Sequence, residues 1–142
     1  MTDESTTPDL VELQKRLTEA ANRRDVDAIV AFYAPDGVYD MSPMGMGTFE
    51  GQVGSRGFLE DWFVSYEEYE LEAEESLDLG KGVGFRVLIQ KGRPVGSSGE
   101  VQLRYAAVGV WDDGKIARMT NYNDIDEARA AAERVAQERA GG

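Results

Sequence analysis

The chain has 142 residues, of which 27 are acidic and 15 are basic, so its formal net charge at pH 7 is −12. This charge repels phosphate backbones and anionic lipid, which argues against nucleic acid and membrane surfaces as partners. The absence of histidine and cysteine excludes disulfides, thiolate nucleophiles, zinc–sulfur sites and the imidazole general base. Acid–base chemistry would depend on carboxylates, tyrosine, lysine or amides, and we expect no metal and no cofactor.

The length and the apolar content predict one folded domain spanning residues 1–142. Hydrophobic residues make up 42% of the chain, which argues against disorder. The first residues, MTDES, are polar and acidic, unlike a secretory signal, and no apolar run approaches the ~18 residues of a membrane span. We therefore expect a cytoplasmic protein whose residues 1–7 form a flexible tail.

The first half of the chain has helical spacing. Thr7, Pro8 and Asp9 resemble a helix start, because a capping residue, a proline and an acid follow one another. Asp25 is a candidate cap for a second, short helix. The expected elements are helices over about 10–21 and 26–33, a turn at 35–37, a short strand over 38–41, a loop rich in glycine and methionine over 42–51, and a third helix over about 52–68.

The second half changes to the period of two that is typical of strands. Its expected elements are strands over 69–79, 83–91, 101–111 and 115–124, turns at 80–82 and 112–114, a flexible connection over 92–99, and a C-terminal helix over about 126–140. Strands with such short links must pair in antiparallel fashion. The order of elements predicts an α+β fold, in which a curved antiparallel sheet forms a half-open cone with a small-molecule pocket at its mouth.

Three short segments carry a resemblance to a known family. They are FYAPDGVYD over 32–40, FEG over 49–51, and WDDGKI over 111–116. With the order of elements over about 10–125, they resemble the SnoaL-like proteins of the nuclear transport factor two-like superfamily, above all actinobacterial members without an assigned function. The resemblance implies a cone-shaped fold that is often dimeric through its sheet. Members include polyketide cyclases, ketosteroid isomerase, limonene epoxide hydrolase and non-catalytic binding or assembly domains.

When the family's functional residues are mapped onto this chain one at a time, most of the positions that transfer a proton hold a different residue type. The isomerase's base on the first strand falls at Met41, with Asp40 one position away. Tyr39 keeps the tyrosine of the hydrolase's Tyr-x-Asn pair and Arg104 keeps the arginine of its Arg-x-Asp pair, but the second residue of each pair is absent. Asn121 stands where the family's last strand has an aspartate. Because an amide does not shuttle a proton as a carboxylate does, the resemblance leaves the chemistry open.

Two carboxylates are candidates for catalysis. Glu75 interrupts the apolar face of the strand over 69–79, and a buried carboxylate with a raised pKa can act as a general acid or base. The alternative is a bulge that turns Glu74 and Glu75 outward, or an ion pair with an arginine. Asp40 is either a base at the mouth of the pocket or an anchor that accepts hydrogen bonds from the loop backbone over 42–47.

Polar residues within the expected strands are candidates for ligand binding. Arg86 and Arg104 either bind a ligand oxygen, pair with a carboxylate, or lie on the outer face of the sheet. Strand alternation places Asn121 and Asn123 on one face with Met119, where their amides either bind a ligand oxygen or cap the end of the strand.

Aromatic and methionine side chains complete the candidate pocket. Trp62 and Tyr66 belong to the apolar stripe of the third helix, and they are core residues, ligand contacts, or both. Tyr39 and Met41 lie on the short first strand, and Met41 together with the loop methionines after it can form an adaptable apolar lid.

Three functions fit such a cavity. The first is a cofactor-independent isomerase, cyclase or hydrolase of a hydrophobic carbonyl- or epoxide-like substrate, with Asp40 or Glu75 moving the proton. The second is a non-catalytic pocket for a small apolar molecule, and the third is a homodimeric scaffold with a filled cavity. The missing carboxylate on the last strand favours the second and third functions, whereas the acid on the apolar face favours the first.

Overall fold

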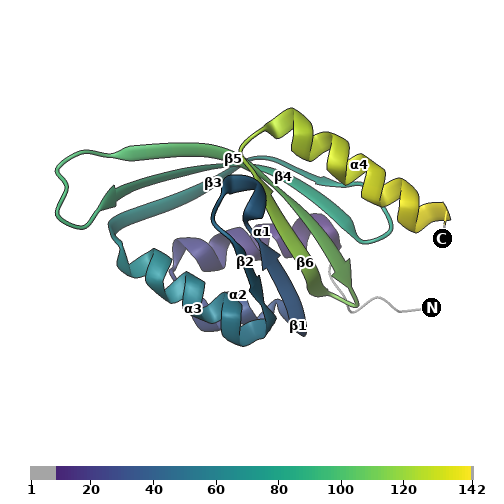
Figure 1. The fold of residues 1–142 in the computed structure, drawn as a ribbon, viewed down its shortest axis with the longest axis horizontal. Coiled ribbons are helices and arrows are strands. Elements are labelled where there is room, and N and C mark those ends of the chain that lie inside the picture. The colour runs from purple at the N-terminus through teal and green to yellow at the C-terminus, as the bar shows by residue number, and fades with distance from the viewer. Residues whose placement is uncertain (1–8, 142) are drawn as a thin grey trace.

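The computed structural model describes residues 9–141. Figure 1 shows the chain as a ribbon coloured by residue number. The expected tail over 1–7, and the helix-start residues Thr7 and Pro8, lie outside the described residues. The elements are α1 (Leu10–Asn22), α2 (Val26–Ala31), β1 (Tyr33–Asp40), the 3-10 helix η1 (Ser42–Met44), β2 (Thr48–Glu50), α3 (Gly51–Val64), β3 (Tyr66–Asp78), β4 (Val83–Pro94), β5 (Val101–Asp112), β6 (Lys115–Tyr122) and α4 (Ile125–Gly141).

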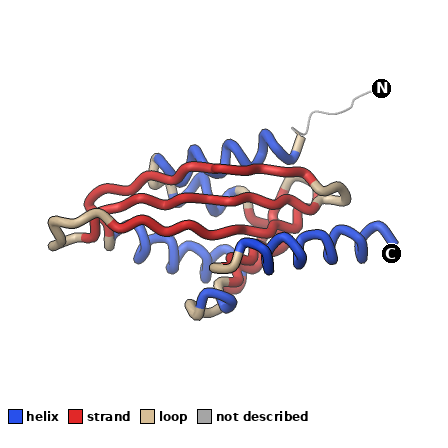
Figure 2. Tube along the Cα trace, turned by 90° about the horizontal axis from the view of Figure 1, so that it is seen from above, coloured by secondary structure: helices blue, strands red, loops and turns tan. Residues whose placement is uncertain are grey.

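The strands form one curved sheet in the order β2-β1-β6-β5-β4-β3. Neighbouring strands are antiparallel, except that β1 runs parallel to β6. Helices α1, α2 and α3 lie on the concave side of the sheet and α4 crosses the convex side (Figures 1 and 2). The predicted α+β fold, a half-open cone with helices before and after the long strands, is confirmed.

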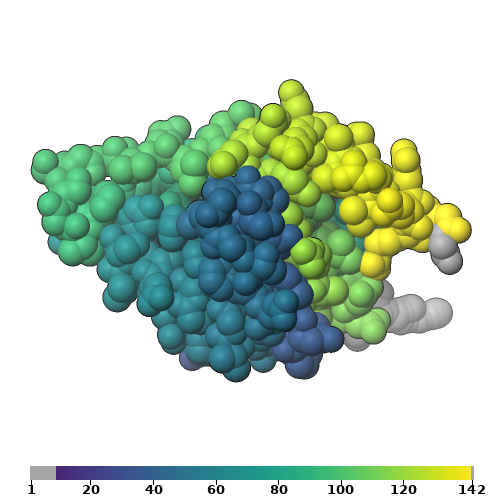
Figure 3. Space-filling view, in the orientation of Figure 1, coloured from purple at the N-terminus to yellow at the C-terminus, as the bar shows by residue number. Residues whose placement is uncertain are grey.

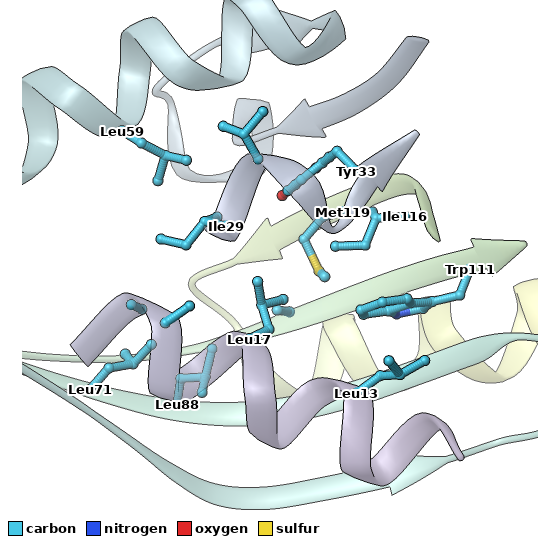
Figure 4. Close-up of a cluster of buried hydrophobic side chains, with 14 of the residues drawn as sticks. Leu13, Leu17, Ile29, Tyr33, Leu59, Leu71, Leu88, Trp111, Ile116 and Met119 are labelled. Carbon is cyan, nitrogen blue, oxygen red and sulfur yellow. The ribbon is translucent and has the colours of Figure 1, made fainter. Parts of the chain in front are cut away.

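The sheet is buried on both sides because helices cover both. The concave cluster includes Leu17, Leu88 and Met119, which Figure 4 shows converging between α1, α2 and the sheet. The convex cluster packs Phe85 and Val108 of the sheet against small residues of α4 such as Ala132. Strand β4 is therefore buried on both faces over residues 83–88, as expected for a strand that lies between two helical layers.

Capping aspartates begin the first two helices. Asp9 caps α1, since its Oδ1 accepts a hydrogen bond of 2.9 Å from the backbone amide of Glu12. The expected cap at Asp25 is confirmed, because its Oδ1 accepts a hydrogen bond of 3.0 Å from the amide of Ala28. Both pairings satisfy amides that have no partner inside the helix.

The boundary between α3 and β3 differs from the sequence expectation. The helix expected over 52–68 ends at Val64, and β3 begins at Tyr66. Arg24, which adopts a positive φ of 55°, donates from Nη1 to the carbonyl oxygens of Phe63 and Tyr66 at 3.2 and 2.7 Å. These two hydrogen bonds hold the end of the helix and the start of the strand.

The segment between β1 and the third helix also contains more structure than expected. The first strand is longer than 38–41, and the loop expected over 42–51 contains η1 and β2. In the space-filling view, this segment forms a continuous surface with α3 over the front of the molecule (Figure 3).

No helix among residues 9–141 is long and apolar enough to cross a bilayer.

Candidate functional site

A cavity of about 70 Å³ lies between the concave side of the sheet and helices α1 to α3. Its walls are mainly apolar and aromatic. The aromatic residues that line it are Tyr33, Tyr39, Phe58, Trp62, Phe63, Tyr69 and Tyr105, and the methionines are Met41, Met44, Met46 and Met119. Its remaining polar groups come from Arg86, Gln90 and Asn121. A largely apolar wall with a few polar groups is typical of a small-molecule site.

Arg86 is the one charged residue among those that line the cavity, and 5% of it is exposed. Its Nη1 donates to Thr18 Oγ1 at 3.2 Å, and Nη2 lies 3.8 Å from Met119 Sδ. Its Nε has no hydrogen-bond partner among the described residues. No carboxylate in residues 9–141 forms an ion pair with this guanidinium, although buried charges are usually paired.

Four tyrosines lie close enough to the Arg86 guanidinium to interact with it electrostatically. They are Tyr33 and Tyr39 of β1, Tyr69 of β3, and Tyr105 of β5. Burial raises the pKa of each phenol, and for Tyr33 and Tyr105 the pKa lies well above its usual value. Burial also lowers the pKa of Arg86. At neutral pH the phenols are therefore protonated, so they can donate hydrogen bonds but bring no negative charge.

Two hydrogen-bonded groups add polarity at other points of the wall. Asn121 Nδ2 donates to the hydroxyl oxygen of Tyr39 at 3.1 Å, which leaves the tyrosine's own proton available to another acceptor. Gln90 accepts a hydrogen bond of 3.2 Å from Trp62 Nε1 and donates one of 3.2 Å to the hydroxyl of Tyr66. Tyr66 is not among the lining residues, but its hydroxyl accepts this hydrogen bond and so positions the amide of Gln90.

Asp40 anchors the loop that closes one side of the cavity. Its Oδ1 accepts hydrogen bonds from the amide and hydroxyl of Ser42 at 2.9 and 2.6 Å and from Thr48 Oγ1 at 3.1 Å, and its Oδ2 pairs with Arg118 at 2.6 Å. Burial alone would raise the pKa of Asp40, but these hydrogen bonds outweigh it and lower the pKa to about 2. This placement corresponds to the loop-anchor alternative, and Asp40 is not among the cavity's lining residues.

Glu75 lies outside the cavity. The register of β3 against β4 shifts between Ala73 and Glu75, and this irregularity turns the side chain towards α4. There, Arg129 Nη2 donates to Glu75 Oε1 at 2.8 Å. Of the two alternatives for Glu75, the structure therefore shows the bulge and the ion pair with an arginine, and the carboxylate does not line the cavity.

Two further candidates also lie away from the cavity. Arg104 is on the outer face, half exposed, and donates to both carboxylate oxygens of Glu74 at 2.8 and 3.2 Å. Asn123 is exposed and follows the last residue of β6. The structure thus brings Tyr39, Met41, Trp62, Arg86 and Asn121 together around one cavity, and it places Arg104 and Asn123 elsewhere.

Sequence reasoning missed Gln90, Tyr105 and Thr18. The first two lie an even number of residues from Arg86 and Leu103 on their strands, so alternation would have placed them on the cavity face once that face was known. Thr18 carries no sequence signal, because its role depends on α1 packing across β4 at Arg86.

The fold and the cavity define the class of protein. The chain has the cone-shaped architecture of nuclear transport factor two-like and ketosteroid isomerase-like proteins. It belongs to the SnoaL-like domain family, whose model matches residues 15–119. No curated protein matches the chain significantly.

Solved structures of similar fold include several proteins of differing function. A hypothetical protein with a ketosteroid isomerase-like fold from Catenulispora acidiphila, in complex with trimethylamine, is 16% identical over 89% of this chain and 94% of its own, with a TM-score of 0.72. TerC, co-crystallised with polyporic acid, is 19% identical over 87% and 97%, with a TM-score of 0.70. The epoxide hydrolase/cyclase-like enzyme SalBIII, involved in pyran ring formation in salinomycin, is 20% identical over 78% and 87%, with a TM-score of 0.68.

Proposed function

We propose that this protein binds a small, mainly apolar molecule in the concave cavity, with an oxygen of the ligand facing Arg86 and the surrounding tyrosine hydroxyls. A carbonyl-containing molecule fits this description. The single observation that carries the proposal is Arg86, a buried cation at an aromatic cavity with a donor that has no partner. A folded protein seldom leaves such a group unsatisfied, unless it serves a ligand.

The wall supports binding more than carboxylate catalysis. No aspartate or glutamate is among the lining residues in the described part of the chain. Asp40 is occupied by four hydrogen bonds, and its lowered pKa makes it a weak base. Two proteins of similar fold were crystallised with small molecules, polyporic acid and trimethylamine, which supports small-molecule binding by this chain.

Tryptophan fluorescence can test the proposal. Trp62 lines the cavity and Trp111 does not, so a ligand in the cavity should change the emission of the wild-type protein and not that of Trp62→Phe. Native mass spectrometry of the protein purified from its own host would identify any molecule that remains bound.

A cavity-filling variant provides the matched control. Ala21 of α1 lines the cavity, and Ala130 of α4 is exposed. In Ala21→Leu the larger side chain occupies part of the cavity, so the dissociation constant of the ligand should rise about tenfold or more. Ala130→Leu should leave the dissociation constant unchanged. Equal affinities in the two variants would place the ligand outside the cavity and contradict the proposal.

We also propose a homodimer formed through the sheet, as the family resemblance implies. Because α4 covers the apolar part of the convex face, a second copy would contact the strip that carries the pair of Glu74 and Arg104. Sedimentation of the wild-type protein and of Arg104→Glu would test this, since the reversed charge should separate the copies.

A further inference from the structure

The charge balance of the cavity indicates the charge of its ligand. Arg86 contributes one positive charge, and every other lining residue in the described part of the chain is uncharged. A guanidinium has five N–H donors, and its two contacts, with Thr18 Oγ1 and Met119 Sδ, leave most of them free. A charge in a poorly solvated site interacts strongly with an added counter-charge. One negative charge on the ligand would complete the site, whereas two would leave a new unpaired charge.

The groups that face Arg86 do not supply this negative charge. From β1, β3 and β5 they are tyrosine hydroxyls, which burial keeps protonated, and from α1 the group is Thr18. The Thr18 hydroxyl donates to the carbonyl oxygen of Gln14 at 3.1 Å, so it accepts from Arg86 and holds Nη1 in place. Figure 4 shows the hydroxyl end of Tyr33 directed into the space between Ile29 and Met119. An anionic oxygen beside the guanidinium would meet no other negative charge among the described lining residues.

The size and lining of the cavity limit the ligand's shape. The free space of about 70 Å³ is smaller than the ~150 Å³ of an apolar cavity that holds benzene. Met44 and Met46 line it from the loop between β1 and β2, and unbranched methionine side chains can shift to enlarge a site. The rings of Phe58 and Trp62 are stacked in the wall, with centroids 5.6 Å apart. The cavity therefore accepts no more than one flat ring, and it accepts that ring only when the loop methionines shift.

We propose that the cavity selects a single-ring aromatic oxygen acid as its monoanion, with the anionic oxygen at Arg86. This inference rests on the proposed binding function and specifies its ligand class. A carboxylic acid is already ionised at neutral pH. For a phenol, the O–H bond breaks on binding, the phenolate remains at the guanidinium, and the proton passes to the solvent buffer. Burial raises the pKa of the cavity tyrosines, which form no hydrogen bond with Arg86, whereas direct contact with the guanidinium should lower the pKa of a bound phenol.

Calorimetric titration with three benzene derivatives tests the charge. At 0.15 M salt, where long-range repulsion by the acidic surface is screened beyond about 8 Å, wild-type protein should bind benzoate at least about tenfold more tightly than neutral benzamide or the dianion phthalate. Arg86→Met should lose the preference for benzoate, and Arg86→Lys, which keeps the charge, should retain it. Arg134→Met removes an exposed arginine of α4 and should behave as the wild type.

A chromogenic phenol tests the proton step. With excess wild-type protein, the absorbance of 4-nitrophenol should show ionisation at a pH about one unit lower than in buffer, a tenfold shift in its acid equilibrium. Arg86→Met should remove this shift. Preference for benzoate with an unshifted nitrophenol would overturn the proton-release step and restrict the ligand to carboxylates.

Other outcomes separate this inference from the binding proposal. If benzamide binds as tightly as benzoate and changes Trp62 fluorescence, the cavity binds apolar molecules without charge selection, so the inference is wrong and the proposed function stands. If Arg86→Met retains the preference for benzoate, the anion binds elsewhere and the inference is also wrong. If neither this panel nor any co-purified molecule changes Trp62 fluorescence, both proposals fail.

Discussion

Arg86 and Ala107 are direct partners across the β4–β5 ladder, and Ala107 in turn pairs with Asn121 on β6. The three residues therefore form one row across three strands, and all three are buried on the concave side. The small side chain of Ala107 leaves room above β5, and the guanidinium of Arg86 extends across it to Met119 Sδ on β6. Ala107 thus determines how far the cation projects into the cavity.

Enlarging Ala107 should impair ligand binding. Ala107→Val adds volume under the guanidinium, so the affinity for benzoate should fall by about tenfold, and overpacking should cost roughly 1–3 kcal/mol of unfolding free energy. Ala106→Val is the matched control, because Ala106 is equally buried but faces α4 on the convex side. Both variants should lose stability in urea, and only Ala107→Val should lose affinity. A similar loss of affinity in both would contradict the row geometry.

Replacing Asn121 with aspartate should supply the missing counter-charge from within the protein. Asn121→Asp places a carboxylate in the same row as Arg86, which then competes with an anionic ligand. We expect the affinity for benzoate to fall by at least about tenfold, while the affinity for benzamide changes little. Asn123→Asp makes the same charge change at an exposed position. Unchanged benzoate affinity in Asn121→Asp would show that the two side chains do not interact.

The carboxylate of Asp40 should stabilise the fold in a pH-dependent way. Its pKa falls from 3.8 in the unfolded chain to about 2 in the folded protein, a difference on the order of 2 kcal/mol. Because the folded pKa is the lower one, this stabilisation is present above pH 4 and is lost as the pH falls towards 2. Asp40→Asn should therefore unfold at lower urea than the wild type at pH 7, and the gap should close between pH 4 and pH 2. Asp36→Asn, at an exposed position of the same strand, should show no gap.

Helix α4 should loosen when Arg129 is removed. Arg129 pairs with Glu75 at 2.8 Å, and its guanidinium lies 4.7 Å from the ring centroid of Phe85. The pair is partly exposed, so Arg129→Met should lose only about 1 kcal/mol of unfolding free energy, mainly through the contact with the ring. Hydrogen exchange of α4 amides should accelerate, and Arg134→Met, exposed on the same helix, should leave exchange unchanged. Equal exchange rates in the two variants would mean that apolar packing alone holds α4.

The fold was predictable because most elements have a clear period and clear ends. The cap at Asp25 and the turns at 80–82 and 112–114 marked boundaries, and the order of elements implied the cone. The cap of the first helix is Asp9, which the sequence pattern placed inside the first turn. The end of α3 was not predictable in the same way. The aromatic stripe continues at helical spacing as far as Tyr66, and what ends the helix at Val64 involves Arg24, a residue distant in sequence.

The site was predictable only in part, because faces of strands depend on tertiary structure. Arg86 lies in a strand with apolar residues on both faces, so alternation gives no sign of which face meets the cavity. A bulge between Ala73 and Glu75 reversed the expected face of Glu75. The loop-anchor role of Asp40 was one of two alternatives in the sequence. Its partner Arg118 comes from β6, which lies parallel to β1 through a pairing that the local sequence does not indicate.

The unpaired guanidinium of Arg86 also connects folding with supply of the ligand. A molecule that binds only the folded chain adds about 2.7 kcal/mol to the unfolding free energy when its concentration is a hundred times its dissociation constant. Proteases that capture transiently opened chains act in proportion to the opened population. Cells that lack the molecule would therefore degrade this protein faster, and the amount of the protein would rise and fall with the concentration of its ligand.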